Sequence, residues 1–271
     1  MFNNARLRSL NRIRPSFKYL IRFDPQKDIF DPKILNQYVD FYKQVVRYFP
    51  DQYDAHGFLG IFYYYSGDYK NSESALRKAV GLNEHNFWHY HNLGGLYFQQ
   101  KRYKEALDIL YKSVFITQDD TFLSILASPI YQQIIYEHRD FDNGKVKRLF
   151  DGYRRVYTML IFILQEEKNY LQMFNTAYGA VKSGVDENGI YLYFAGLAAF
   201  NLKEFQKAAF LFQESIKKNS NFTESYYYLG LSYEKIGKIE EAKTAAQRAV
   251  FLKEQGIMNV PLELKFYPAF Y

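Results

Sequence analysis

The chain has 271 residues, 48% hydrophobic and 24% charged, so it is long enough to bury a large core in one or two domains. It contains no cysteine, which excludes disulfides, zinc–thiolate sites and thiol nucleophiles. Its formal net charge is +6, and its 27 tyrosines and 25 phenylalanines suit half-buried helix faces and interfaces.

The excess positive charge lies in a basic N-terminal arm, residues 1–23. This arm contains no acidic residue, and its basic residues are Arg6, Arg8, Arg12, Arg14, Lys18 and Arg22. The rest of the chain holds 29 basic and 29 acidic residues, so its charge is balanced. A nucleic-acid-binding surface on the body is therefore not indicated.

Apolar residues recur in the arm at steps of three and four, from Leu7 to Ile21, with a break at Pro15. This basic amphipathic pattern has three interpretations. The arm could rest on an anionic membrane surface, serve as an organelle-targeting presequence, or cap the body as a first helix with a basic extension. The compartment stays open, with the cytoplasm favoured. The longest apolar run, 156–164, is about half of what a bilayer span requires.

A spacing of Leu-Gly-x-x-Tyr recurs along the body. It begins at Leu59, Leu93 and Leu229, and a weaker version begins at Ala195. An alanine follows in three of these stretches, 12 residues after the glycine. A frame of 34 residues placed on these anchors starts units at Tyr53, Phe87, Gly189 and Thr223.

These residues resemble the tetratricopeptide repeat, whose signature is W-x2-L-G-x2-Y, then A-x3-F, then P. The resemblance implies an all-α fold, a right-handed α–α superhelix of about six helix pairs. The expected organisation is the arm 1–23, an N-terminal capping helical unit 24–52, two repeats in 53–120, degenerate repeat-like helices in 121–188, two repeats in 189–256, and an apolar C-terminal tail 257–271. In each unit the glycine at position 8 allows close approach of the two helices, and Gly67 and Gly237 occupy turns that require a positive φ.

In this family the first helix of each pair lines a concave groove, at positions 2, 5, 9, 12 and 13. Transferred to this sequence, the groove is apolar and aromatic, typical of interface hot spots. The expected partner-binding residues are Ile61, Tyr64, Tyr65, Trp88, His91, Phe98, Tyr193, Leu197, Phe200, Tyr227 and Leu231. We expect the groove to accept a peptide or an amphipathic helix from another protein. The family's carboxylate clamp for chaperone tails is not expected, because only Asn92 matches its pattern.

Alternatives to a protein ligand remain open at this stage. The groove could be filled by the chain's own arm or tail. The tail contains Pro261 and Pro268, which disfavour a long helix, so we expect an extended strip lying across the last helix pair. The chain could also be a structural subunit that builds a larger assembly through its convex face and basic arm. The oligomeric state is not predicted.

Enzymatic motifs are missing from the sequence. It has no phosphate-binding loop, dinucleotide fingerprint or nucleophile elbow. His85 and His89 are four residues apart, but the frame places His85 in a turn and no carboxylate completes a metal site. The prediction is therefore a non-catalytic adaptor or scaffold without catalytic residues, metal or cofactor.

Overall fold

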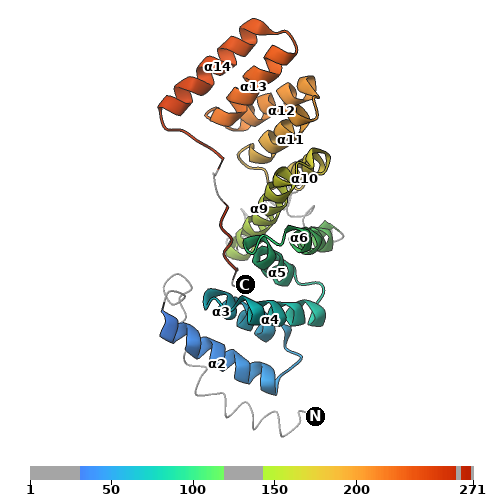
Figure 1. The fold of residues 1–271 in the computed structure, drawn as a ribbon, viewed down its shortest axis with the longest axis vertical. Helices are drawn as coiled ribbons and strands as arrows, with labels where there is room; N and C mark the ends of the chain where they lie inside the picture. Colours follow the sequence, from blue (N-terminus) through green and yellow to red (C-terminus); the bar gives the residue numbers. More distant parts are fainter. Residues whose placement is uncertain (1–30, 119–142, 261–263, 270–271) are drawn as a thin grey trace. The chain divides into compact units, whose positions relative to one another are not determined.

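The computed structural model describes residues 31–118, 143–260 and 264–269, and all regular secondary structure in these ranges is α-helical (Figure 1). The chain divides into two compact units. The first comprises residues 1–116 together with 266–271, and the second comprises 117–265. The predicted basic arm lies outside the described residues, as do residues 121–142. None of the described helices combines the length and apolarity that a membrane span requires.

The first unit consists of helices that pack as antiparallel neighbours. They are α2 (Pro32–Tyr48), α3 (Tyr53–Tyr65), α4 (Tyr69–Leu82), α5 (Phe87–Gln99) and α6 (Tyr103–Gln118). The helix α2 covers the outer side of the first pair, where Tyr38 and Phe62 stack with ring centroids 4.9 Å apart. The N-terminal cap of α2 is Asp31, whose carboxylate accepts from the Lys33 amide.

The second unit continues the same alternation of helices. It contains α9 (Asn143–Glu166), α10 (Tyr170–Lys182), α11 (Ile190–Asn201), α12 (Phe205–Lys218), α13 (Thr223–Lys235) and α14 (Ile239–Glu254).

The predicted repeat frame is confirmed by the helix starts. The first helices of four pairs begin at Tyr53, Phe87, Ile190 and Thr223, within one residue of the expected positions. The exception is α9, which begins at Asn143 rather than near residue 154. The additional stretch 143–153 contains no proline, and a helix can include its two glycines, Gly144 and Gly152, at a cost of about 1 kcal/mol each relative to alanine.

Glycine at position 8 brings the two helices together in the pairs α3–α4, α5–α6 and α11–α12. A Cβ atom added to Gly60 would lie 2.6 Å from Leu76 Cγ, and one added to Gly94 would lie 2.6 Å from Leu110 Cδ2. The same sixteen-residue offset separates Gly196 from Phe212, in the second unit. At each of these contacts, a side chain of the second helix occupies the space that a side chain at position 8 of the first helix would need. The residue at position 8 must therefore be small.

The turn between the two helices of each pair uses the left-handed backbone region. Gly67 has a φ of 78° and Gly237 a φ of 79°, as the sequence predicts. Lys101, Lys168 and Lys203 occupy the equivalent turns, with φ values of 59°, 55° and 64°. A side chain in this region is strained, so three of the turns form against their local preference.

Exchanging residue types at this turn should change stability in opposite directions. We expect Gly67→Ala to lower the free energy of unfolding by about 0.5–1 kcal/mol, because alanine disfavours a positive φ and nothing lies within 4 Å of the added Cβ. We expect Lys101→Gly to raise it by a similar amount. Urea unfolding followed by the emission of Trp88, the only tryptophan, measures both. If both substitutions change the free energy of unfolding in the same direction and by the same amount, a strained positive φ at these turns is contradicted.

Candidate peptide-binding groove

The C-terminal segment 266–269 lies extended against α3 and α5 of the first unit (Figure 1, dark red trace). The expectation that the whole tail lies across the last helix pair is therefore wrong for these residues. Among the described tail residues, 257–260 contact the start of α13, where the Glu224 carboxylate accepts from the amides of Asn259 and Val260 at 3.0 and 3.1 Å. The side chain of Phe266 packs instead against aromatic rings on α3 and α5.

Groove side chains hold this segment by its main chain. The hydroxyl of Tyr64 donates to the carbonyl of Phe266 at 3.0 Å, and that of Tyr65 donates to the carbonyl of Pro268 at 3.2 Å. Asn92 forms a two-point contact with Ala269: its Oδ1 accepts from the amide at 2.8 Å and its Nδ2 donates to the carbonyl at 3.0 Å.

A fifth contact to the main chain comes from Gln99, whose Oε1 accepts from the amide of Phe266 at 3.4 Å. The segment thus adds no backbone pairing with another strand. The polar backbone groups of Phe266, Pro268 and Ala269 bind side chains that project from two successive helix pairs.

The ring of Phe266 occupies an aromatic socket and is only 4% exposed. Its centroid lies 5.8 Å from that of Tyr64, edge to face, and 5.5 Å from the ring of His91. The floor of the socket is the backbone of Gly95: a Cβ placed there would lie 2.0 Å from Phe266 Cε2. The ring therefore sits directly on α5, where only glycine leaves room.

Burial further favours the protonated form of the donor in this site. Desolvation, followed by the neighbouring tyrosines Tyr69 and Tyr65, raises the pKa of Tyr64 above its ordinary value. The hydroxyl therefore remains protonated at neutral pH and can donate to the segment's carbonyl.

The predicted groove residues of the first unit fall into two groups. Tyr64, Tyr65 and His91 contact the segment 266–269. Ile61 is fully buried between helices, and Phe98 is 6% exposed with its ring 6.2 Å from that of Tyr103. Trp88 is half-buried, and its ring lies 5.5 Å from that of His91, which links it to the edge of the socket.

In the second unit, two of the five predicted groove residues, Tyr193 and Leu197, lie in the core. Tyr193 is 5% exposed and stacks on Phe222 at 5.3 Å, so its ring fills the space between repeats instead of lining an open surface. Leu197 is 7% exposed and Phe200 is half-buried against the ring of Phe205.

Further along the second unit, Tyr227 is 53% exposed and Leu231 is half-buried. Of the second-unit groove candidates, Tyr227 thus has its ring most open to solvent.

Three residues that hold the segment were not among the expected partner-binding residues. Asn92 stood out in the sequence only as a match to the clamp pattern, at position 6 of its repeat. Gly95 and Gln99 fall on the groove face by position, but a glycine and an exposed amide carry no apolar signal. The position in the repeat could have found all three, whereas a search for aromatic side chains could not.

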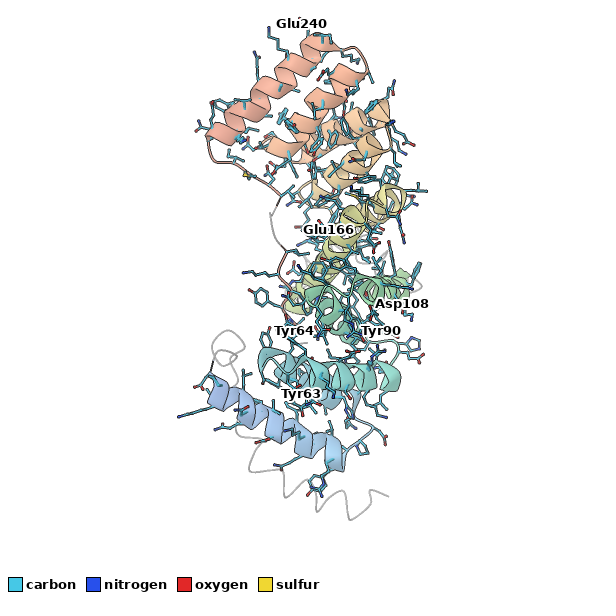
Figure 2. All side chains as sticks on the ribbon, viewed as in Figure 1. Tyr63, Tyr64, Tyr90, Asp108, Glu166 and Glu240 are labelled. Atoms are coloured by element: carbon cyan, nitrogen blue, oxygen red, sulfur yellow. The ribbon has the colours of Figure 1, made fainter. Side chains whose placement is uncertain are left out.

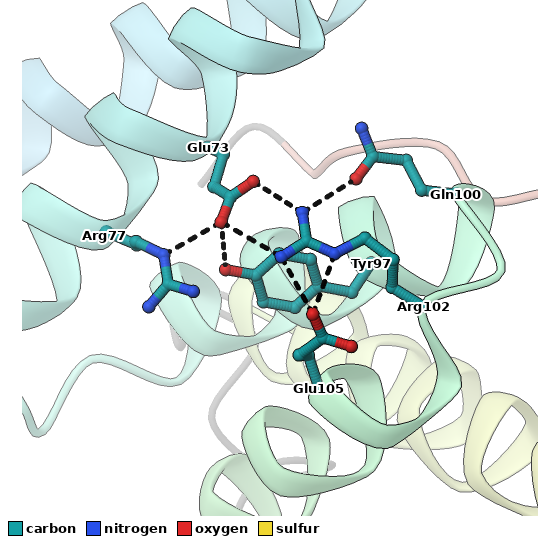
Figure 3. Close-up of polar contacts among 6 residues, drawn as sticks. All are labelled: Glu73, Arg77, Tyr97, Gln100, Arg102 and Glu105. Carbon is teal, nitrogen blue, oxygen red and sulfur yellow. Dashed lines mark hydrogen bonds and ion pairs between the residues drawn. The ribbon is translucent and has the colours of Figure 1, made fainter.

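A polar cluster fixes the repeats that carry the groove (Figure 3). The carboxylate of Glu73 on α4 pairs with Arg102 at 2.6 Å and accepts from the hydroxyl of Tyr97 on α5 at 2.9 Å. Arg77 binds the same carboxylate at 3.0 Å, and the guanidinium of Arg102 stacks 4.3 Å from the centroid of the Tyr97 ring. Hydrogen bonds from Arg102, then from Arg77 and Tyr97, lower the pKa of Glu73 to about 2.

The histidines of α5 serve packing. Burial lowers the pKa of His89 to about 4, so it is neutral at pH 7, and its ring lies 5.7 Å from that of Tyr53. Among the described side chains, no set of three His, Asp or Glu residues is placed to hold a metal ion.

Helix pairs in a 34-residue register with a groove on their first helices define a repeat protein. Three stretches match models of the tetratricopeptide repeat: 53–86, 88–117 and 211–244. The chain belongs to the tetratricopeptide repeat family. Repeats of this kind form extended concave binding surfaces, so its class is that of a protein–protein interaction scaffold. No curated protein matches the chain.

Solved structures show the same fold at low sequence identity. YrrB, described as a TPR protein with an unusual peptide-binding site, is 14% identical with a TM-score of 0.56, over 79% of this chain and 92% of its own. BtubC from P. vanneervenii is 12% identical with a TM-score of 0.54, over 89% and 96%. PilF from Pseudomonas aeruginosa is 18% identical with a TM-score of 0.51, over 93% and 92%.

The charge cluster should make the first unit sensitive to acid. The folded pKa of Glu73 lies below its ordinary 4.5, so its stabilisation is complete above about pH 4.5 and is lost as pH falls toward 2. We expect Glu73→Gln to lower the free energy of unfolding at pH 7 by about 1–3 kcal/mol and to flatten its decline between about pH 5 and 2.

The matched control is Glu84→Gln, at an exposed position in the loop after α4. Denaturant unfolding at several pH values, followed by Trp88 emission, makes the comparison. A Glu73→Gln variant with the same pH slope as the parent would refute the role of this cluster.

Proposed function

We propose that the groove of the first unit binds an extended segment of another protein, and that the C-terminal segment 266–269 is its resident occupant in the free chain. The observation that carries this proposal is the set of hydrogen bonds from Tyr64, Tyr65, Asn92 and Gln99 to the main chain of that segment. Main-chain groups are common to all peptides, so the same side chains can hold a segment of different origin.

The groove is also preorganised for this task. Tyr64 and Tyr65 (Figure 2 labels Tyr64) project from α3, whereas Asn92 and Gln99 project from α5, and the Glu73 cluster ties the two helix pairs together. A rigid donor and acceptor array lowers the entropic cost of binding a flexible ligand. The described peptide-binding site of YrrB, which shares the repeat architecture, supports the same kind of activity here. The function requires no catalytic residue or cofactor.

A peptide of the tail's own sequence tests this proposal on the full-length chain. The labelled peptide corresponds to residues 264–271, and the protein carries Phe266→Ala, which removes the aromatic anchor of the resident segment. We expect this variant to bind the peptide about tenfold or more tightly than the parent chain, because the parent groove is already occupied. Fluorescence anisotropy measures the affinities.

The groove side of the contact is tested in the same background. Adding Asn92→Ala should weaken peptide binding by about thirtyfold, since two hydrogen bonds of about 1 kcal/mol each are lost. Asn36→Ala, at an exposed position on α2, is the matched control and should leave binding unchanged. Failure of the Phe266→Ala chain to bind the peptide, or equal binding by the Asn92→Ala and Asn36→Ala chains, would refute the proposal.

A further inference from the structure

The resident segment shows which side chains the groove recognises. Phe266 and Pro268 are buried, whereas Lys265 and Tyr267 are exposed, the latter by 56%. This alternation is that of an extended chain in which every second residue faces the binding surface. The groove therefore contacts two side chains of the segment, separated by one residue that faces solvent.

The aromatic position is selected by Gly95. Any side chain there would overlap the ring of Phe266, because the Cβ would lie 2.0, 2.2 and 2.3 Å from three of its carbon atoms. The preceding Gly94 has a different task, since its missing Cβ makes room for Leu110 within the helix pair. Gly94 thus allows the two helices of its pair to pack closely, whereas Gly95 leaves room for the ring of Phe266.

The position of Pro268 fits the pattern of donors and acceptors. The amides of Phe266 and Ala269 are bound by Gln99 and Asn92, respectively. Proline has no amide hydrogen, so no acceptor is needed at position 268, and its carbonyl accepts from Tyr65. Proline also keeps the preceding residue extended, which reduces the conformational freedom lost on binding.

We infer that the groove reads an aromatic-x-proline motif, and that its partner is an unstructured protein segment carrying this motif in extended form. Gly95 is the specificity-determining residue, because it alone admits the aromatic ring. This inference rests on the peptide binding proposed above and adds the sequence that the partner must carry.

Peptide substitutions test the motif on the full-length Phe266→Ala chain. The parent peptide 264–271 is compared with three variants that carry alanine at the position of Phe266, Tyr267 or Pro268. We expect at least tenfold weaker binding for the first, a change of less than about twofold for the second and several-fold weaker binding for the third. A peptide that binds equally well without its phenylalanine would overturn the motif, while the proposed peptide binding would stand.

Substitutions of glycine in the protein provide the second arm. Gly95→Ala should reduce binding of the parent peptide at least tenfold, although alanine favours helix formation. Gly81→Ala, on α4 with nothing within 4 Å of its added Cβ, shares the helix effect and should leave binding unchanged. Circular dichroism checks that both variants keep their helix content. Equal binding by these two chains would overturn the role of Gly95. Absence of any binding by the parent peptide would overturn the proposed function and the motif together.

Discussion

The close approach of two helices at a glycine is the constraint on which the rest of the structure depends. At Gly60 and Gly94 the missing side chain leaves room for a leucine sixteen residues later, so the second helix lies directly on the first. Large residues on either side of this contact then fill the space between helices. Because successive pairs within a unit repeat the same order of helix, turn and helix, they stack on one another, and their first helices share one surface.

On that shared surface, tyrosine hydroxyls and amide side chains from two adjacent helix pairs bind the main chain of the segment 266–269 and take the place of a neighbouring strand. In the proposed function, these contacts hold the main chain of an extended segment, and the socket at Gly95 adds the preference for an aromatic side chain. The chain's own segment 266–269 is tethered nearby, and a tethered ligand has an effective concentration on the order of millimolar. In the proposed function, a partner displaces this segment, so its apparent affinity for the chain is lower than its affinity for an empty groove.

The two units use their aromatic residues differently. In the first unit, Tyr64 and His91 face a bound chain segment, whereas in the second unit Tyr193 packs against Phe222 and the ring of Tyr228, 6.1 Å away. Both Tyr64 and Tyr193 fall on first helices at positions assigned to the groove. The difference arises because a large ring at position 5 can reach the next repeat, where Phe222 and Tyr228 offer apolar contacts that solvent does not.

The sequence by itself determined the helix pairs, their 34-residue register and the turns at Gly67 and Gly237, because these depend on small residues at fixed spacing and on local backbone preference. It also indicated which face carries the groove. Only the tertiary structure decided what lies in it. The contact of Phe266 with Gly95 joins residues about 170 positions apart, and no local pattern encodes such a pairing. Whether a tyrosine on a first helix faces a ligand or the core likewise depends on the neighbouring repeat, which a single helix does not specify.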